Sequence, residues 1–155
     1  MSRLSLDASR RIRPTPFASE ISRPYWNAAR EGVLRLQRCT ACHTAIHYPR
    51  RWCPECWATD LEHFDACGRG AVVTYTIVHE SPFEAFDAHT PYVLAIVRLE
   101  EGPTMLANIV GPDAMEVAIG DPVEVRFEKR NGWTVIPQFE RSAAATGTRD
   151  APSGG

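Results

Sequence analysis

Hydrophobic and polar residues alternate in several short runs in the second half of the chain. Five of these runs are rich in β-branched and aromatic residues: 71–79, 92–99, 104–110, 122–128 and 133–139. Alternation with a period of two is typical of strands that bury one face. Stretches rich in glycine, proline and aspartate, such as "RNG", separate the runs. We therefore expect five strands between residues 67 and 141, and five short strands of this kind fit a small barrel of the OB-fold type.

Two sequence features add detail to the predicted barrel. The helix that often lies between the third and fourth strands of an OB-fold has only a short stretch near Met115 available, so a turn is expected there. Gly68 and Gly70 flank Arg69 just before the first run. Glycines in this arrangement predict a bulge or a sharp bend at the start of the barrel.

The first half of the chain predicts a short helix. Ser22 can cap it, Pro24 suits its first turn and Gly32 can end it. Tyr25 and Trp26 give this helix two large aromatic side chains that need a surface to cover. They either pack on their own domain or contact a partner, and we carry both as candidate residues of a partner interface.

A short strand should follow the helix. In "VLRLQR", which begins at Val33, Leu34 and Leu36 point to one face and Arg35 and Gln37 to the other.

The two ends of the chain show no clear periodicity. Residues 1–20 include two prolines and predict a flexible arm that is mobile until it docks. Residues 142–155 have no aliphatic residue larger than alanine, which predicts a disordered tail. The expected organisation is an arm (1–20), a helix plus a cysteine-containing module (21–66), an OB-fold (67–141) and a tail (142–155).

The composition is that of an ordinary globular protein. Hydrophobic residues make up 44% of the 155 residues, and the formal net charge is -2. No apolar run approaches the roughly 20 residues that span a bilayer, and the arginines near the N-terminus have no apolar core behind them. These patterns predict a cytoplasmic protein that is not in the membrane. Clustered thiols in a reducing compartment favour a metal over disulfides.

Four of the five cysteines form two C-x-x-C pairs: Cys39, Cys42, Cys53 and Cys56. Two such turns on opposing loops can supply the four tetrahedral thiolates that zinc prefers, and iron is the second choice. A thioredoxin-like redox site would need a neighbouring βαβ pattern, which is absent. Catalytic zinc would need an open position. The spacing therefore predicts a structural zinc site, and we expect the nearby His43 and His47 to face solvent.

Cys67 stands apart from the two pairs. As a nucleophile it would need a base such as His63, His79 or His89, and nothing in the sequence pairs it with one. We expect it to be inert and buried. The sequence shows no other catalytic constellation.

The charge is unevenly distributed. Residues 1–67 carry ten Arg/Lys against seven Asp/Glu, whereas residues 68–141 carry six against eleven. OB-folds that bind single-stranded nucleic acid use a basic groove with exposed aromatics. Here the barrel is the acidic part, and its Tyr75, Phe127 and Trp133 can be explained by packing. The cations gather instead in the cysteine-containing module, at Arg35, Arg38, Arg50 and Arg51, either as a solvated face or as a contact for an anionic ligand or an acidic partner.

The ordered motifs "PYWNAAREGVLRLQRC", "CTAC", "CPEC", "GRGAVVTYTIVH", "PYVLAIVRLEEGP" and "GDPVEVRFE" resemble a family of small proteins. In that family an N-terminal rubredoxin-like zinc ribbon precedes a C-terminal OB-fold. The resemblance covers about residues 20–140. It implies that Cys39, Cys42, Cys53 and Cys56 are metal ligands.

The resemblance also implies a function. Members of this family are commonly non-catalytic partners of thiolase-superfamily enzymes that act on acyl-CoA: thiolases, retro-aldolases and C-acyltransferases. It therefore implies an accessory subunit in a hetero-oligomer that helps form an acyl-CoA site. Arg50 and Arg51 are candidates for contacts with the phosphates of CoA. Two alternatives stay open: a single-stranded nucleic-acid-binding OB-fold protein, and a free-standing acyl-CoA-binding protein.

Overall fold

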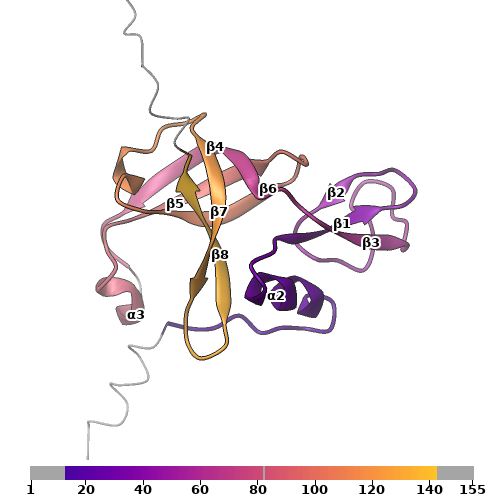
Figure 1. The fold of residues 1–155 in the computed structure, drawn as a ribbon, viewed down its shortest axis with the longest axis horizontal. Helices are drawn as coiled ribbons and strands as arrows, with labels where there is room; N and C mark the ends of the chain where they lie inside the picture. Colours follow the sequence, from indigo (N-terminus) through magenta and orange to yellow (C-terminus); the bar gives the residue numbers. More distant parts are fainter. Residues whose placement is uncertain (1–12, 82, 143–155) are drawn as a thin grey trace, which may run out of the picture.

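The structure is a computed structural model that describes residues 13–81 and 83–142. A β-barrel lies beside a smaller three-stranded sheet, and one helix lies at the foot of the junction between them (Figure 1). The barrel strands are β4 (Arg69–Val78), β5 (Tyr92–Leu99), β6 (Thr104–Val110), β7 (Pro122–Lys129) and β8 (Val135–Arg141). They close in the order β4-β5-β6-β8-β7, and all pairs are antiparallel except β6 with β8.

This arrangement confirms the predicted five-stranded OB-fold, and the predicted runs match the observed strands to within two residues at each end. The period of two explains why. Along β5, Val93, Ala95, Val97 and Leu99 are buried, whereas the residues between them are less so. Phe139 of β8 is fully buried and belongs to the core of the barrel.

Two short helices lie in the connections between barrel strands. The 3₁₀ helix η1 (Ala114–Glu116) lies between β6 and β7, where a turn near Met115 was predicted. The helix α3 (Glu84–Asp87) follows β4 and was not predicted. Four residues are too few to show a helical period, and no side chain caps the start of α3.

The glycines before the first barrel strand have two different roles. Gly68 has a φ of +76°, so it makes the sharp bend that the sequence predicted. A Cβ at Gly70 would lie 2.5 Å from the carbonyl oxygen of Arg98, so Gly70 permits the close approach of β4 to β5. The irregularity in the β4–β5 register lies further on, between Val72 and Thr74.

The predicted helix is α2 (Arg23–Arg30), and Gly32 follows it with a φ of +78°. Ser22 occupies the N-cap position, as predicted, but its side chain makes no capping bond. The main-chain N–H of Ser22 instead donates to Oγ of Ser19 (3.3 Å). The chain already turns at residues 20–22, so this side-chain contact lies one turn before the N-cap.

The smaller sheet consists of β1 (Arg35–Cys39), β2 (Ala45–Ile46) and β3 (Leu61–Asp65), in the antiparallel order β2-β1-β3. We call residues 33–66, which contain this sheet and both cysteine pairs, the ribbon. Strand β1 lies where "VLRLQR" predicted it. Strand β3 was not predicted, because none of its side chains is fully buried and its hydrophobic pattern is correspondingly weak.

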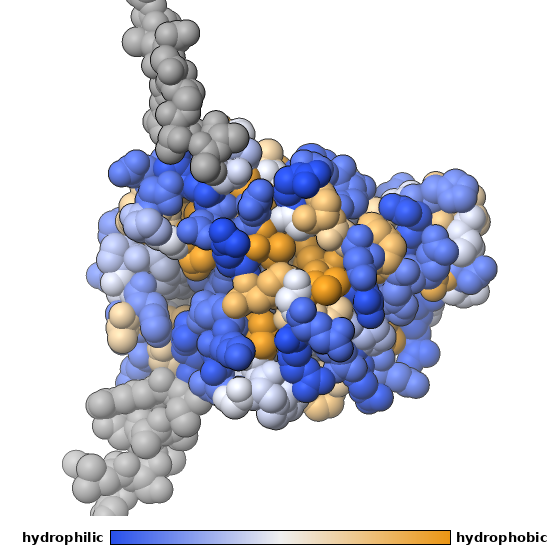
Figure 2. Space-filling model, in the orientation of Figure 1, coloured by the Kyte–Doolittle hydropathy of each residue, from blue (hydrophilic) through white to orange (hydrophobic). Residues whose placement is uncertain are grey.

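The ribbon and the barrel share one hydrophobic core. Tyr25 of α2 and the residues Leu34 and Leu36 belong to the same buried cluster as the barrel residues. The main-chain N–H of Ala66 donates to the carbonyl of Leu34 (2.8 Å) where the chain leaves the ribbon. Figure 2 shows apolar side chains gathered at the centre of this face, over the junction of barrel and ribbon.

The described part of the N-terminal arm lies on the β7–β8 hairpin. Arg13 pairs with Glu128 (3.0 Å), and the side chain of Asn131 donates to the carbonyl of Arg13 (2.7 Å). The predictions for residues 1–12 and for the tail from residue 143 lie outside the described residues. Within the described ranges, we find no helix with the length and apolar character that a membrane span requires.

Candidate metal centre and surrounding surfaces

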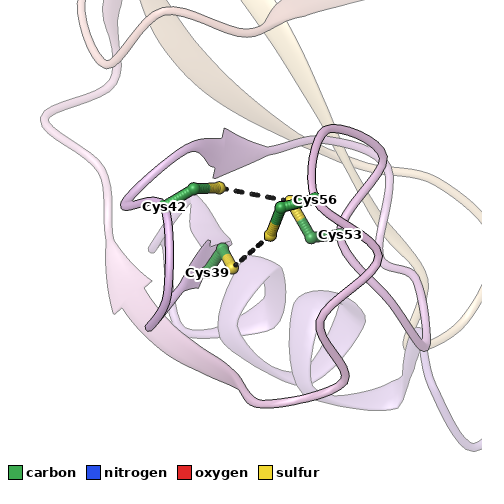
Figure 3. A group of neighbouring side chains, drawn as sticks. All are labelled: Cys39, Cys42, Cys53 and Cys56. Carbon is green, nitrogen blue, oxygen red and sulfur yellow. Dashed lines mark hydrogen bonds between the residues drawn. The ribbon is translucent and has the colours of Figure 1, made fainter.

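The two C-x-x-C pairs meet at one point of the ribbon. The sulfur atoms of Cys39, Cys42, Cys53 and Cys56 all lie within 4.8 Å of one another (Figure 3). Sγ of Cys39 is 3.5 Å from Sγ of Cys56, and the same distance separates Cys42 from Cys53. Each cysteine of the first pair thus faces one of the second.

Both pairs are built by the same local hydrogen bonds. The N–H of Cys39 donates to the carbonyl of Thr44 (3.0 Å), and the N–H of His43 donates back to the carbonyl of Cys39 (2.9 Å). Cys53, Ala58 and Trp57 repeat this pattern at 2.8 and 3.0 Å. His43 and Trp57 both have a φ above +60°. Because neither residue is glycine, the sequence did not reveal these left-handed turns.

The geometry fits a tetrahedral metal ion. Four ligands at the Zn–S distance of ~2.3 Å would place neighbouring sulfurs roughly 3.8 Å apart, and the observed pairs are 3.5 Å apart. Cys39 and Cys53 are buried, whereas Cys42 and Cys56 lie towards solvent. The four-cysteine cluster is therefore consistent with a structural zinc ribbon.

Local hydrogen bonds shift the pKa values of two of the four thiols in opposite directions. Hydrogen bonding to Thr44 lowers the pKa of Cys42 to about 6. The backbone N–H of Ala58 favours the thiolate of Cys56, but hydrogen bonds with Cys39 and Cys42 outweigh it and raise the pKa of Cys56 to about 12. Four thiolates at this spacing would repel one another, so they need a cation to balance their charge.

Gln37 fixes the loop that precedes the second cysteine pair. Its side chain was expected to face solvent but is 5% exposed, because this loop covers it. Its Nε2 donates to the carbonyl of Arg50 (3.1 Å), and its Oε1 accepts from the N–H of Arg50 (2.7 Å). The backbone at Arg50 is thus held in place from β1.

The four candidate cations of the ribbon differ in their environment. Arg35 forms a two-pronged ion pair with Asp65 (2.7 and 3.1 Å), and the guanidinium of Arg38 lies 4.0 Å from the ring centre of Phe64. Arg50 and Arg51 are exposed. These two candidate ligand-binding residues are therefore the more available members of the set.

Arg50 lines a groove of about 500 Å³ between the ribbon and the turn that joins β5 to β6. His43 and His47 line it from the ribbon, and Glu101 and Thr104 line it from the barrel. Arg51 does not belong to this lining. Glu101 contributes an acidic group, so the groove has mixed charge.

The expectation that His47 faces solvent is wrong. Both of its ring nitrogens are buried and lack a hydrogen-bond partner. The imidazole lies near two aromatic rings, with centroid distances of 5.5 Å to Tyr25 and 4.0 Å to Tyr48. Burial lowers the pKa of His47 to about 4, so this histidine is neutral near pH 7. His43 is exposed, as predicted.

Cys67 is exposed rather than buried, which corrects the prediction. Its thiol lies 3.4 Å from a carboxylate oxygen of Glu100, and its N–H donates to Glu101 (2.7 Å). Desolvation and these two carboxylates raise the pKa of Cys67. A raised pKa keeps this thiol protonated, and a protonated thiol is a poor nucleophile. Cys67 therefore lacks the features of a catalytic cysteine.

Tyr25 and Trp26 have different positions on α2. Tyr25 is only 5% exposed and belongs to the core, so it packs on its own chain and offers little surface to a partner. Trp26 is half-buried, with its ring edge-on to Tyr25 at a centroid distance of 4.9 Å. Of the two candidates for a partner interface, Trp26 is the one that keeps accessible surface.

The aromatics assigned to packing in the barrel also differ. Phe127 is half-buried and packs against the core, whereas Tyr75 is 37% exposed. Trp133, in the β7–β8 hairpin, is 67% exposed, and the guanidinium of Arg30 lies 5.1 Å from its ring centre. The packing interpretation is therefore wrong for Trp133.

The fold and the four-cysteine cluster define a two-part protein, in which a rubredoxin-like zinc ribbon precedes an OB-fold barrel. Residues 26–62 match the family description of the rubredoxin-like zinc ribbon domain of ChsH2. Residues 64–128 match that of the ChsH2 C-terminal OB-fold domain. The chain belongs to the DUF35 family of ChsH2-type proteins.

Similar proteins and structures agree with this assignment. A DUF35 domain-containing scaffold protein of Pyrococcus furiosus is 37% identical over 112 residues, which are 71% of this chain and 79% of that protein. A solved chain described as "Ltp2-ChsH2(DUF35) aldolase" is 33% identical, with a TM-score of 0.72. The match covers 81% of this chain and 98% of that one.

One relative is much longer than this chain. A probable enoyl-CoA hydratase alpha subunit of Thermomonospora curvata is 34% identical over 128 residues, which are 83% of this chain. This chain spans only 40% of that relative's length. The hydratase activity of that protein is therefore not assigned to this chain.

Proposed function

We propose that this chain is a non-catalytic accessory subunit of a thiolase-superfamily enzyme that acts on acyl-CoA, such as a thiolase, a retro-aldolase or a C-acyltransferase. The observation that carries the proposal is the similarity to nearly the whole length of a DUF35 chain from an Ltp2–ChsH2 aldolase. The scaffold proteins among the relatives support a role in assembly. In this proposal the ribbon holds one structural zinc ion through its four cysteines.

The chemistry of the described residues supports a partner that supplies catalysis. In residues 13–81 and 83–142, the four cysteines form the only cluster of three or more potential metal-binding side chains. Four thiolates close a zinc shell and leave no position for a substrate. The side chains that contact Cys67 are the carboxylates of Glu100 and Glu101, which disfavour its thiolate. An enzyme of this composition would lack both an activated nucleophile and an open metal.

The proposed joint site lies where the ribbon meets the barrel. Trp26 provides accessible aromatic surface near this junction, and aromatic and arginine side chains are enriched in the energetic centres of interfaces. Arg50 and Arg51 would contact the phosphates of CoA, since the planar guanidinium binds phosphate oxygens in pairs. The Gln37 contacts that hold the backbone of Arg50 would orient this loop.

Co-expression with a thiolase-like protein from the same source tests the proposal. We expect the two chains to co-elute on size-exclusion chromatography, and the pair, but not this chain alone, to cleave or form acyl-CoA. Trp26→Ala should weaken the complex, whereas Ile119→Ala, at an exposed apolar residue of another loop, should not. Arg50→Ala combined with Arg51→Ala should raise KM for the CoA substrate and leave the complex intact. Separate elution together with full activity of the thiolase-like protein alone would reject the proposal.

A further inference from the structure

A smaller groove, of about 240 Å³, lies on the outside of the barrel, away from the ribbon groove. Side chains of β5, β6 and β8 line its floor, and α3 and the β7–β8 hairpin each contribute one lining residue. In Figure 1, α3 lies at the lower left of the barrel and this hairpin projects below the centre of the barrel. Strands β5 and β6 are the second and third strands of the OB-fold, whose outer face is the usual ligand-binding face of this fold.

The groove lies where strands β6 and β8 are no longer paired by backbone hydrogen bonds. Their parallel ladder comprises only Ile109 with Phe139 and Val110 with Glu140. Beyond it, the side chain of Gln138 bridges the strands and accepts a hydrogen bond from the N–H of Asn108 (3.1 Å).

The groove has an accessible apolar part beside its polar lining residues. Leu94, Leu106 and Ile136 line it, and Leu106 is 53% exposed. This is an unusual exposure for a leucine in the middle of a strand, and it leaves apolar surface for a ligand to cover.

Arg130 sits in the same groove with an unsatisfied donor. Its side chain is only 10% exposed, and its buried Nε makes no hydrogen bond. The nearest carboxylate oxygen, Oε1 of Glu128, is 3.7 Å away and lies 3.0 Å from the guanidinium of Arg13. One carboxylate is therefore shared by two cations. A buried cation without a full set of acceptors is costly, so this end of the groove favours an added anion.

We propose that this groove binds a small amphipathic carboxylate. Its alkyl chain lies on Leu94, Leu106 and Ile136, and its carboxylate pairs with the guanidinium of Arg130, which lines the groove. The volume is below the ~300–1,000 Å³ that is typical of drug-sized ligand sites, so it suits a short chain. A nucleic-acid strand would need several cations along its path, and the barrel segment has six Arg/Lys against eleven Asp/Glu. This proposal does not depend on the thiolase-like partner.

Calorimetric titration of the full chain with decanoate and with decan-1-ol tests the proposal. We expect saturable binding of one decanoate per chain and weaker binding of decanol. Arg130→Met keeps the length of the side chain and removes its charge. It should weaken decanoate binding at least about tenfold, because a charge-assisted hydrogen bond is lost, and should leave decanol binding unchanged.

Leu106→Glu should weaken the binding of both compounds, because it places a carboxylate on the apolar floor. Ile119→Glu is the matched control, since Ile119 is 69% exposed and does not line the groove; it should change neither affinity. Three outcomes would overturn the proposal: no saturable binding of decanoate, equal decanoate affinity of the wild type and Arg130→Met, or equal affinities of the wild type and Leu106→Glu.

Discussion

His47 illustrates how burial changes the chemistry of a single residue. Its imidazole lies near the rings of Tyr25 and Tyr48, with no hydrogen-bond partner for either nitrogen. The pKa falls from 6.5 to about 4 because the charged form would lose its hydration. The folded state therefore binds this proton less readily than the unfolded state. The stability that results is fully present above about pH 6.5 and is lost as the pH falls towards 4.

His47→Phe should remove this pH dependence. Integrated over the interval between 6.5 and about 4, the histidine contributes at most about 3 kcal/mol of stability at neutral pH that is lost in acid. Urea unfolding at pH 7.0, 5.5 and 4.5 checks this. The wild type should lose more stability than the variant over this range, and taking the difference cancels the acid sensitivity of the cysteine cluster. Parallel losses in the two proteins would show that His47 does not titrate as described.

Arg141 is the most enclosed charge of the barrel. Its side chain is 4% exposed and pairs with Asp121 at 3.0 Å and with Asp113 at 3.1 Å. Arg141→Met should lower the free energy of unfolding by about 3 kcal/mol, because it leaves partly buried carboxylates without their cation. Arg126, at 59% exposure, pairs with Glu140 on the surface, so Arg126→Met should cost less than about 1 kcal/mol. Equal losses in urea unfolding of the two variants would contradict this assignment.

Among the elements of the fold, those with a strong period were predictable. Strands β5 and β6 bury every second side chain, and that alternation is visible in the sequence without any tertiary information. Strand β3 has no fully buried side chain and α3 has only four residues, so neither carries a periodic signal. Their conformations depend on what they pack against: β3 pairs with β1 along its whole length. The secondary structure of such elements is therefore set by tertiary contacts and cannot be predicted from the local sequence.

We expect the ribbon to depend on a bound metal more than on its own core. Its own buried cluster consists of Cys39, Ile46 and Cys53, which is too small to fold a module independently. Cys53→Ser should therefore lose the metal and loosen the ribbon. Elemental analysis should find one zinc per wild-type chain and far less than one in the variant. Cys67→Ser, at the cysteine outside the cluster, should keep both the zinc and the stability of the wild type; loss of zinc from this control would contradict the assigned ligand set.

In the site, too, features set by local sequence were predictable and features set by tertiary contacts were not. The spacing of the cysteines was enough to place four sulfurs together, because a C-x-x-C turn has one compact geometry. Burial was not predictable for Gln37 and His47, because the loop over Gln37 and the Tyr25 ring near His47 come from other parts of the chain. Tyr25 was left with two interpretations for the same reason. Its burial depends on the barrel, which lies on the other side of the shared core.

At the scale of the whole molecule, the charge distribution argues against nucleic-acid binding. The barrel segment carries six Arg/Lys against eleven Asp/Glu, and neutralisation of phosphates by Lys and Arg dominates such affinities. Fluorescence anisotropy with labelled single strands at physiological salt should show nothing tighter than the ~10⁻⁴–10⁻⁶ M of non-specific binding. The exposed rings of Tyr75 and Trp133 make this a fair test, since they could stack on bases. Nanomolar, salt-sensitive binding would favour the nucleic-acid alternative.

The central claim is that this chain completes an acyl-CoA enzyme rather than acting alone. The most direct measurement is a titration of this chain, purified separately, into a fixed amount of its thiolase-like partner while acyl-CoA turnover is followed. We predict that turnover rises with added chain and saturates at a fixed molar ratio, and that the zinc-free Cys53→Ser variant fails to restore it. Turnover that is already maximal without this chain, and unchanged by its addition, would contradict the claim.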